Sequence, residues 1–335
     1  MTKPPGELDL IRQIQSGTRP SVRVPLGIGD DCAILRPPPR HDVLVTTDFT
    51  LEGRHFRRDT HSPESAGHRT LARGLSDLAA MGATPLAAFL SLALPRELLS
   101  TASGRTWFAR YLAGLQTLAA THGVTLAGGD TSQSPSPHIL ADIVLTGTAP
   151  RGRALRRSTA QAGDNLYVTG SLGGAAAELE RLFAHPPQRK PTSGDHPQLF
   201  PAPRLAMGQA LLRRRLATAC MDLSDGLSTD LTHLCEASGI RAEILATALP
   251  MHPQATIEQA LNGGEDYELL FTASSTTRVP RKIAGISITR IGRVLPVLAN
   301  TPRITLIDQT GKPTAVAAAG WQHLAEIPPQ AKSKT

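Results

Sequence analysis

Apolar residues follow two different periods along the chain, and the breaks between the apolar runs are rich in glycine, proline and small polar residues. Runs that favour strands lie at Val43–Thr47, Val124–Ala127, His138–Thr148, Asn165–Thr169, Ala217–Leu223, Leu269–Ala273 and Ile286–Ile291. Longer stretches that favour helices run from Ser62 to Met81, Ala102 to Thr121, Gly174 to Ala184 and Leu205 to Leu212. This alternation predicts an α/β (α+β) protein with two domains, each a mixed β-sheet flanked by helices.

Local signals define the ends of several elements. Ser62 and Pro63 form a helix start, with serine as the N-cap and proline at the first helical position. Gly82 stops that helix, and Gly123 stops the next one. A hairpin turn is expected at 310–312, between strands at 304–307 and 315–318.

A domain boundary is expected near Pro150. Residues 1–149 then form an N-terminal α/β domain, residues 150–327 form a C-terminal α/β domain, and residues 328–335 form a polar tail. The segment 185–203 is rich in proline, glycine and polar residues, so it is expected to be a long surface loop. A further helix is expected to open at Ser224-Asp225-Gly226.

Six acidic motifs place a carboxylate beside glycine or a small hydroxyl residue. They lie at 27–31, 46–48, 75–77, 128–131, 222–226 and 263–267. Asp48 is expected at the end of a strand, Asp77 near the last turn of a helix, and Asp130 in a glycine-rich break after a strand. Glycine lets the backbone approach a ligand closely, and hydroxyl and carboxylate oxygens are the hard ligands that Mg²⁺ prefers.

A single motif of this kind is interpreted most simply as a helix cap or an Asx-turn. That interpretation suits Asp225, as an acidic residue in the first turn of a helix. It explains six recurrences less well, because converging carboxylates repel one another unless a cation lies among them. Several Mg²⁺ ions are therefore expected, since each takes only one or two protein carboxylates. Such a site suits transfer of a phosphoryl group from ATP to a second anion.

The usual signatures of other nucleotide and catalytic sites are absent from the sequence. Gly311-Lys312 is followed by proline and lacks the upstream glycine of a P-loop, and Gly27-Ile28-Gly29 does not open a dinucleotide-binding helix. No histidine or cysteine spacing suits zinc, and no Ser-His-Asp arrangement is evident. An acceptor that is itself a phosphate needs no strong general base, because its oxygen is already ionised. No catalytic acid or base is therefore singled out.

Composition and charge give weaker indications about the partners and the location of the protein. The 335 residues carry a formal charge of +7, yet the arginines are scattered and aromatic residues are few, so a nucleic-acid partner is not favoured. No apolar run is long enough to span a membrane, and the N-terminus shows no secretory signal. The three cysteines form no CxxC pair, which suits a cytoplasmic location.

The motifs together resemble the thiamine-monophosphate kinase family, within the superfamily of aminoimidazole ribonucleotide synthetase. The matching segments run in order along the chain as GIGDDCAIL, VTTDFTLEGRHF, LARGLSDLAAMGATP, LAGGDTS, GRALRRS, MDLSDGLSTDL and ALNGGEDYELLFT, and Gly320-Trp321 follows near the C-terminus. GIGDD and SDL-type motifs recur across the superfamily, whereas the TTD-x₆-HF spacing, LSDLAAMGA and GGEDYEL are more specific to this kinase family.

The resemblance implies a fold, an activity and a set of site residues. The activity is the ATP-dependent phosphorylation of thiamine monophosphate to thiamine diphosphate, in a homodimer whose N-terminal domains join their sheets. The implied Mg²⁺ ligands are Asp30, Thr46, Thr47, Asp48, Asp77, Asp130, Asp222 and Asp225. The implied ATP-binding residues are Gly129, Asp130, Arg157 and Ser224. The implied contacts with thiamine monophosphate are His55, Glu265 and Trp321.

General chemistry agrees with these implied roles, and alternatives stay open. Trp321 offers a flat face to a cationic ring, Glu265 offers a countercharge, and His55 can donate a hydrogen bond to a phosphate. Each of them also has an ordinary interpretation as a core, strand-entry or loop residue. The remaining alternatives are another ATP-using enzyme of the superfamily, of the aminoimidazole ribonucleotide or selenophosphate synthetase type, and a non-catalytic nucleotide- or cation-binding relative. The segment 183–199 departs from the family pattern.

Overall fold

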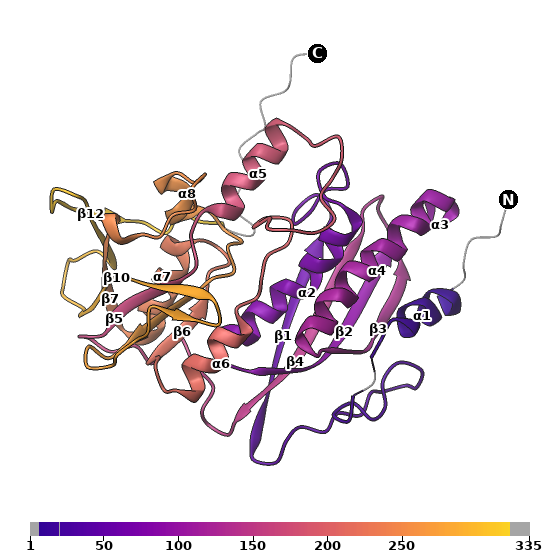
Figure 1. Cartoon of the computed structure of the whole chain (residues 1–335), viewed down its shortest axis with the longest axis horizontal. Coiled ribbons are helices and arrows are strands. Elements are labelled where there is room, and N and C mark those ends of the chain that lie inside the picture. Colours follow the sequence, from indigo (N-terminus) through magenta and orange to yellow (C-terminus); the bar gives the residue numbers. More distant parts are fainter. Residues whose placement is uncertain (1–6, 20, 322–335) are drawn as a thin grey trace.

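The computed structural model describes residues 7–19 and 21–321 and consists of two sheets with helices packed on them (Figure 1). The predicted polar tail at 328–335 lies outside these described residues. In the part of the chain that is described, no helix is both long enough and apolar enough to cross a membrane. The prediction of two mixed sheets flanked by helices is confirmed.

The first sheet has the strand order β1-β4-β2-β3. Its strands are β1 (His41–Leu51), β2 (Thr84–Leu94), β3 (Thr125–Gln133) and β4 (Leu140–Pro150). Only β2 and β3 run parallel; the β1–β4 and β2–β4 pairs are antiparallel. Two long helices, α2 (Pro63–Ala80) and α4 (Ala102–His122), lie side by side on one face of this sheet (Figure 1). Helices α1 (Glu7–Ser16) and α3 (Arg96–Ser100) complete this half.

The second sheet has the order β12-β11-β7-β10-β5-β8-β6. Its strands are β5 (Asn165–Thr169), β6 (Ala219–Asp222), β7 (Ile240–Leu245), β8 (Leu269–Ala273), β10 (Ile286–Pro296), β11 (Ile304–Ile307) and β12 (Pro313–Val316), and the short β9 (Lys282–Ile283) pairs with β10. The helices of this half are α5 (Gly174–Ala184), α6 (Leu205–Arg213), α7 (Leu227–Ser238) and α8 (Ile257–Asn262), with a 3₁₀ turn at Ala246–Ala248. Only β7 and β11 pair in parallel, so this sheet is also mixed.

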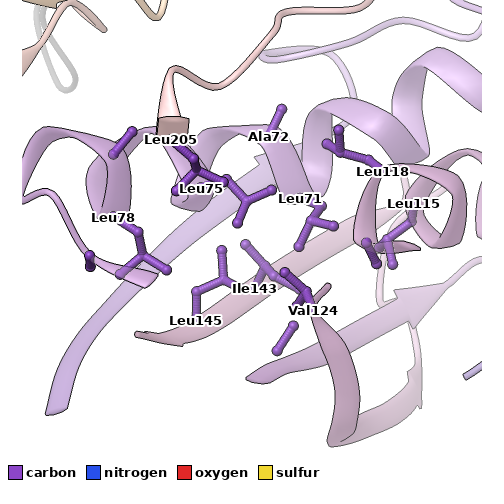
Figure 2. Packing of buried hydrophobic residues seen from close by; sticks show 14 of the residues in the cluster. Leu71, Ala72, Leu75, Leu78, Leu115, Leu118, Val124, Ile143, Leu145 and Leu205 are labelled. Atoms are coloured by element: carbon purple, nitrogen blue, oxygen red, sulfur yellow. The ribbon is translucent and has the colours of Figure 1, made fainter. Parts of the chain in front are cut away.

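Helix α2 connects the two halves. It begins as predicted at the N-cap Ser62, whose hydroxyl accepts a hydrogen bond from the Ser65 N–H at 3.2 Å, and ends before Gly82 at φ +67°. Leucines along α2 pack against the first sheet and against α4, and Leu205 of α6 joins the same core (Figure 2). Gly208 of α6 lies so close to α2 that a Cβ would sit 1.8 Å from the Ala79 carbonyl oxygen. Glycine therefore permits the helix contact that brings the two halves together.

Three local predictions were wrong, and a fourth was right only in part. Asp48 lies inside β1 rather than at its end, because β1 pairs with β4 along its whole length. Residues 128–130 continue as strand β3, since β2 offers them a parallel partner. Asp225 precedes α7 instead of lying in its first turn. The segment 185–203 has no helix or strand, yet its end is buried, with Gln198 and Leu199 inside the protein.

Candidate functional site

A cavity of about 270 Å³ lies where the two halves meet, and we call it the junction cavity. Its walls come from β1, α2 and the 52–56 turn on one side, and from the ends of β6 and β8 and the start of α5 on the other. The predicted residues Asp48, His55, Asp77, Asp222, Ser224, Asp225, Glu265 and Trp321 all line it. Residues far apart in the sequence are thus brought together in one place.

Three aspartates form the acidic side of the junction cavity. Burial raises the pKa of Asp48 to about 6, and burial together with the nearby Asp222 charge raises that of Asp77 to about 6. Burial also raises the pKa of Asp222, although the Ser76 hydroxyl donates to this carboxylate at 2.7 Å. Thr46 donates a short hydrogen bond to Asp77. Carboxylates that repel one another away from water favour a cation between them.

Arginine and amide groups surround Glu265, which lines this cavity together with Arg73. Glu265 accepts hydrogen bonds from Arg69 at 2.5 Å, from Arg73 at 3.3 Å and from the Gln198 amide at 2.8 Å. Burial alone would raise the pKa of Glu265, but the two guanidinium groups hold it below its usual value. Glu265 is therefore ionised near neutral pH, and its charge is shared with two arginines.

The loop that carries Glu265 is held in an uncommon backbone conformation. Glu265 and Tyr267 have φ angles of +68° and +50°, in the left-handed region that side chains other than glycine seldom adopt. Hydrogen bonds from the Glu265 N–H to the Ser224 carbonyl and from the Tyr267 N–H to the Leu223 carbonyl fix this geometry at 2.8 and 2.9 Å. Backbone strain of this kind persists only where the surrounding structure holds the residue in place, and it is found most often at functional sites.

Two further aspartates in these motifs bind backbone amides. Asp266 accepts from the N–H groups of Gly173 and Ala175 at the start of α5, at 2.6 and 3.2 Å. Asp230 accepts from the N–H groups of Asp225 and Gly226, both at 3.1 Å, before α7. Burial raises the pKa of Asp266 to about 7 and that of Asp230 to about 8. These side chains hold the turns on which the site is built.

The turn before α7 also positions Trp321 and Ser224. The Trp321 N–H donates to the Asp225 carbonyl at 2.9 Å, and the Gly320 N–H donates to the Thr229 hydroxyl at 3.0 Å. Trp321 lines the junction cavity and is 48% exposed. On the other wall, His55 Nδ1 accepts from the Leu51 N–H at 3.0 Å. A neutral His55 ring therefore carries its proton on Nε2.

Three other predicted residues lie around a second cavity of about 830 Å³, which we call the outer cavity. Asp30, Gly129 and Asp130 line it, together with apolar side chains of α1. Strand register places Asp130 on the face of the first sheet that carries Asp142, opposite the face of Asp48. Thr47 belongs to this outer face as well, because its hydroxyl donates to Asp142 at 2.7 Å. The structure therefore separates the predicted metal ligands into two groups.

Arg157 lies outside the walls of both cavities as described. Its side chain is exposed, but its positive charge lowers the pKa of both Asp77 and Asp222. The guanidinium group therefore acts electrostatically on the acidic side of the junction cavity. Within residues 7–19 and 21–321, no three histidine, cysteine, aspartate or glutamate side chains are placed to hold one metal ion together.

Several residues of the site were missed by the sequence analysis, and for different reasons. Arg69 and Arg73 follow Ser62 on helix α2, so their helical spacing of four could have placed them on the face that bears Asp77. Tyr267 lies inside the GGEDYE motif itself. Gln198 carried no signal, because it comes from the proline-rich segment that was interpreted as a surface loop. Asp142 also carried none within its apolar strand.

Comparison with known proteins identifies the class of the fold. Residues 29–149 match the family model "AIR synthase related protein, N-terminal domain", and residues 161–279 match "AIR synthase related protein, C-terminal domain". The chain is thus a two-domain protein of the AIR synthase related class.

Within this class, the chain belongs to the thiamine-monophosphate kinase family. It is 36% identical over 336 residues to the thiamine-monophosphate kinase of Escherichia coli K12, covering 96% of this chain and 98% of that protein. The crystal structure of thiamine-monophosphate kinase from Stenotrophomonas maltophilia K279a matches with a TM-score of 0.75 and 33% identity, over 92% of this chain and 96% of the other. AaThiL complexed with AMPPCP and TMP matches with a TM-score of 0.73 and 31% identity, over 95% and 96% of the two chains.

Proposed function

We propose that this protein transfers the γ-phosphoryl group of ATP to the phosphate of thiamine monophosphate, which yields thiamine diphosphate and ADP. The observation that carries the proposal is the 36% identity to the Escherichia coli thiamine-monophosphate kinase along nearly the whole length of both chains. The relative AaThiL, complexed with AMPPCP and TMP, supports the pairing of a nucleotide with an acceptor. In this chain, the motifs around Asp48, Asp77, Asp222 and Glu265 supply residues to the junction cavity, and those around Asp30 and Asp130 supply residues to the outer cavity.

Magnesium fits the acidic side of the junction cavity by the chemistry of its donors. Asp48, Asp77 and Asp222 are carboxylates with raised pKa values, and the Thr46 hydroxyl is bonded to Asp77. Mg²⁺ prefers such oxygen ligands and usually takes only one or two carboxylates, completing its shell with water and phosphate. When bound, it would neutralise the negative charge of the phosphoryl groups. We propose these residues, together with Asp225, as its ligands on this side, and Thr47 as a ligand on the outer face of the first sheet, where its hydroxyl donates to Asp142.

The chain's own groups bind and orient the two substrates. Ser224 and Arg157 contact the ATP phosphates, and the Arg157 guanidinium adds positive charge close to Asp77 and Asp222. His55 donates from Nε2 to the acceptor phosphate, and Trp321 stacks on its cationic ring. The acceptor oxygen is already ionised, so no side chain removes a proton in this mechanism. Catalysis then rests on positioning and on stabilisation of charge.

Asp30, Gly129 and Asp130 are proposed to bind ATP and a further Mg²⁺ from the outer face of the first sheet. Val43, Val45 and Phe49 are exposed apolar side chains on that same face, with exposed fractions of 48%, 66% and 63%. We propose that a second copy of the chain covers this face, so that the protein is a homodimer joined through its N-terminal sheets. An apolar face of this kind is typical of a surface that another subunit buries.

Two further assignments accompany this function. We place the division between the N-terminal and C-terminal domains at residues 149 and 150, which agrees with family models that end at 149 and resume at 161. We also propose a cytoplasmic location, where ATP is available. Cys32, Cys220 and Cys235 are all free thiols, which suits a reducing compartment.

An assay of the purified protein with ATP, Mg²⁺ and thiamine monophosphate tests the proposal. Thiamine diphosphate, separated by chromatography, is expected to accumulate in step with ADP. Free thiamine serves as the control acceptor, and a parallel reaction with excess chelator tests the need for Mg²⁺. Folded protein that forms no thiamine diphosphate under these conditions would refute the proposed activity. Formation of product in the presence of the chelator would refute the magnesium assignment alone.

A further inference from the structure

Arg73 links the acidic side of the junction cavity to the Glu265 side. Its Nη2 donates to Asp48 at 3.2 Å, and its Nη1 donates to Glu265 at 3.3 Å and to the Tyr267 hydroxyl at 2.9 Å. The side chain lines the cavity and is only 12% exposed. Arg54 lines the same cavity but is exposed to solvent. Arg73 is therefore the arginine whose charge is held inside the wall of this cavity.

One edge of the Arg73 guanidinium is only half used. Its Nε is buried and has no hydrogen-bond partner in the described structure, while Nη2 on the same edge has Asp48. Elsewhere in this protein that edge takes two carboxylate oxygens. Arg110 donates from Nε and Nη2 to Glu64 at 2.6 and 3.0 Å, and Arg204 donates from Nε and Nη2 to Glu268 at 2.7 and 2.5 Å. Once Asp48 leaves Nη2, the whole Nε–Nη2 edge of Arg73 has the shape that a two-oxygen anion fits.

Charge balance indicates when such an anion would bind. Asp48, Arg73, Glu265 and Arg69 form a chain of alternating charges, so these four side chains balance one another without a ligand. Asp48 is also one of the carboxylates that fit Mg²⁺. A cation on Asp48 would weaken the Asp48–Arg73 pair and leave the Arg73 charge uncompensated. Under the proposed function, the phosphate of the acceptor is an anion that can then pair with Arg73.

We propose that Arg73 is the residue that selects a phosphorylated acceptor, by binding two oxygens of its phosphate through Nε and Nη2 once a divalent cation has taken Asp48. This inference rests on the proposed function and names a specificity-determining residue for it. Two consequences follow. Arg73 competes with the divalent cation for Asp48 in the protein alone, and it contributes to binding of thiamine monophosphate but not of ATP.

Steady-state kinetics of Arg73→Gln test the second consequence. We expect the KM for thiamine monophosphate to rise about 10–100-fold, because a bidentate bond between charged groups is lost. The KM for ATP is expected to stay within about twofold of the wild-type value. Arg110→Gln, which removes an arginine–carboxylate pair whose members do not line the cavity, is the matched control and should change neither constant. A KM for thiamine monophosphate that stays at the wild-type value in Arg73→Gln would overturn the proposal.

Titration with Mn²⁺ in the absence of nucleotide tests the first consequence and needs no catalytic activity. Arg73→Gln is expected to bind Mn²⁺ about tenfold more tightly than the wild type, since a coupling of this size is common between neighbouring sites. A residue with a merely structural role would instead weaken Mn²⁺ binding along with substrate binding, and that outcome would also overturn the proposal. If Arg73→Gln does not fold, Arg73→Lys keeps the charge but lacks the two-toothed edge. It should raise the same KM without tightening Mn²⁺ binding.

The two tests separate this inference from the proposed function. Wild-type protein that forms no thiamine diphosphate contradicts the function, whereas the Mn²⁺ titration still reports on the competition between Arg73 and the cation. If the wild-type protein is active and the Arg73→Gln variant has the same kinetic constants and the same Mn²⁺ affinity, only the role of Arg73 is contradicted.

Discussion

The junction cavity and the outer cavity are both lined by aspartates from the family motifs, but these side chains differ in burial and in the charges around them. In the junction cavity, Asp48, Asp77 and Asp222 are partly or wholly buried, and guanidinium groups of α2 and of the 151–157 turn act on them. In the outer cavity, Asp30 and Asp130 are exposed, and Leu8, Ile11 and Ile14 of α1 form an apolar part of the wall. Only the first cavity is closed by both halves of the chain.

This difference shows that a carboxylate beside glycine has no fixed meaning in a sequence. The aspartates of the junction cavity are removed from water and repel one another, so a bound cation would stabilise their ionised forms. Both effects follow from the contact between α2 and β6. The exposed aspartates have water as a partner and have no such need of a cation until a second chain or a nucleotide covers them. Experiments that treat the two groups separately can therefore test how far the site depends on the fold of one chain.

The largest effect is expected for Asp48→Asn. We expect its kcat to fall by about 10²–10³-fold, because the variant removes one of the charges that hold a cation against the phosphates. Asp130→Asn is the matched change in the outer cavity, and we expect a loss of activity there too if ATP spans both cavities. Circular dichroism should show that both variants keep the wild-type fold.

The outcome of this pair sharpens the comparison of the two cavities. Turnover like that of the wild type in Asp48→Asn would contradict the metal assignment in the junction cavity. Full activity in Asp130→Asn, with activity lost in Asp48→Asn, would confine the site to the junction cavity and remove the outer aspartates from the proposal.

An intermediate effect is expected on stability, measured without divalent cations. Asp77 has a folded-state pKa of about 6, above its ordinary value of 3.8, so its ionised form destabilises the fold at higher pH. Asp77→Asn should therefore be more stable than the wild type at pH 8, by about 1–2 kcal/mol. This advantage should shrink as the pH falls below 6, because Asp77 then becomes protonated in the folded protein. It should vanish below about 3.8, where Asp77 is protonated in both the folded and the unfolded state.

Thermal unfolding at several pH values measures this effect. Asp130→Asn is the control, since replacement of an exposed side chain usually changes stability by less than about 0.5 kcal/mol. An Asp77→Asn variant that is less stable than the wild type at pH 8 would show that other groups of the protein already stabilise the ionised Asp77. That result would contradict the argument that the junction cavity favours a cation.

The smallest effect is expected for Gln198→Ala. This variant removes one of the three donors to Glu265, so we expect a loss of about 1 kcal/mol, seen as a rise of about fivefold in the KM for thiamine monophosphate. The KM for ATP should not change. Gln209→Ala, which removes an amide bonded to the Ala83 carbonyl away from the cavity, is the control. Equal kinetic constants in both variants would mean that the 185–203 segment does not reach the site in solution.

Elements with strong local signals were predicted from the sequence with correct ends. Helix α2 has a serine cap, a proline and a stop glycine, and strands β5 and β8 are short apolar runs bounded by polar residues. Strand β2 was missed, because after Thr84 its sequence is mostly alanine and leucine, has no further β-branched residue and fits a helix equally well. The extra lengths of β1 and β3 were missed because pairing with β4 and β2 outweighs the low strand preference of glycine and aspartate.

The sequence by itself determined the two-domain class, the family and the acidic motifs of the site, since these depend on residue types and on short-range order. Only the tertiary structure decided which aspartates share a cavity, because the alternation of side chains in a strand sends Thr46 and Thr47 to opposite faces of one sheet. It also decided that Arg73 and Gln198 meet Glu265, since these contacts join segments from different elements and leave no pattern along the chain. Burial away from water exists only in the packed protein, and it is the main cause of the raised pKa values of the aspartates in the site.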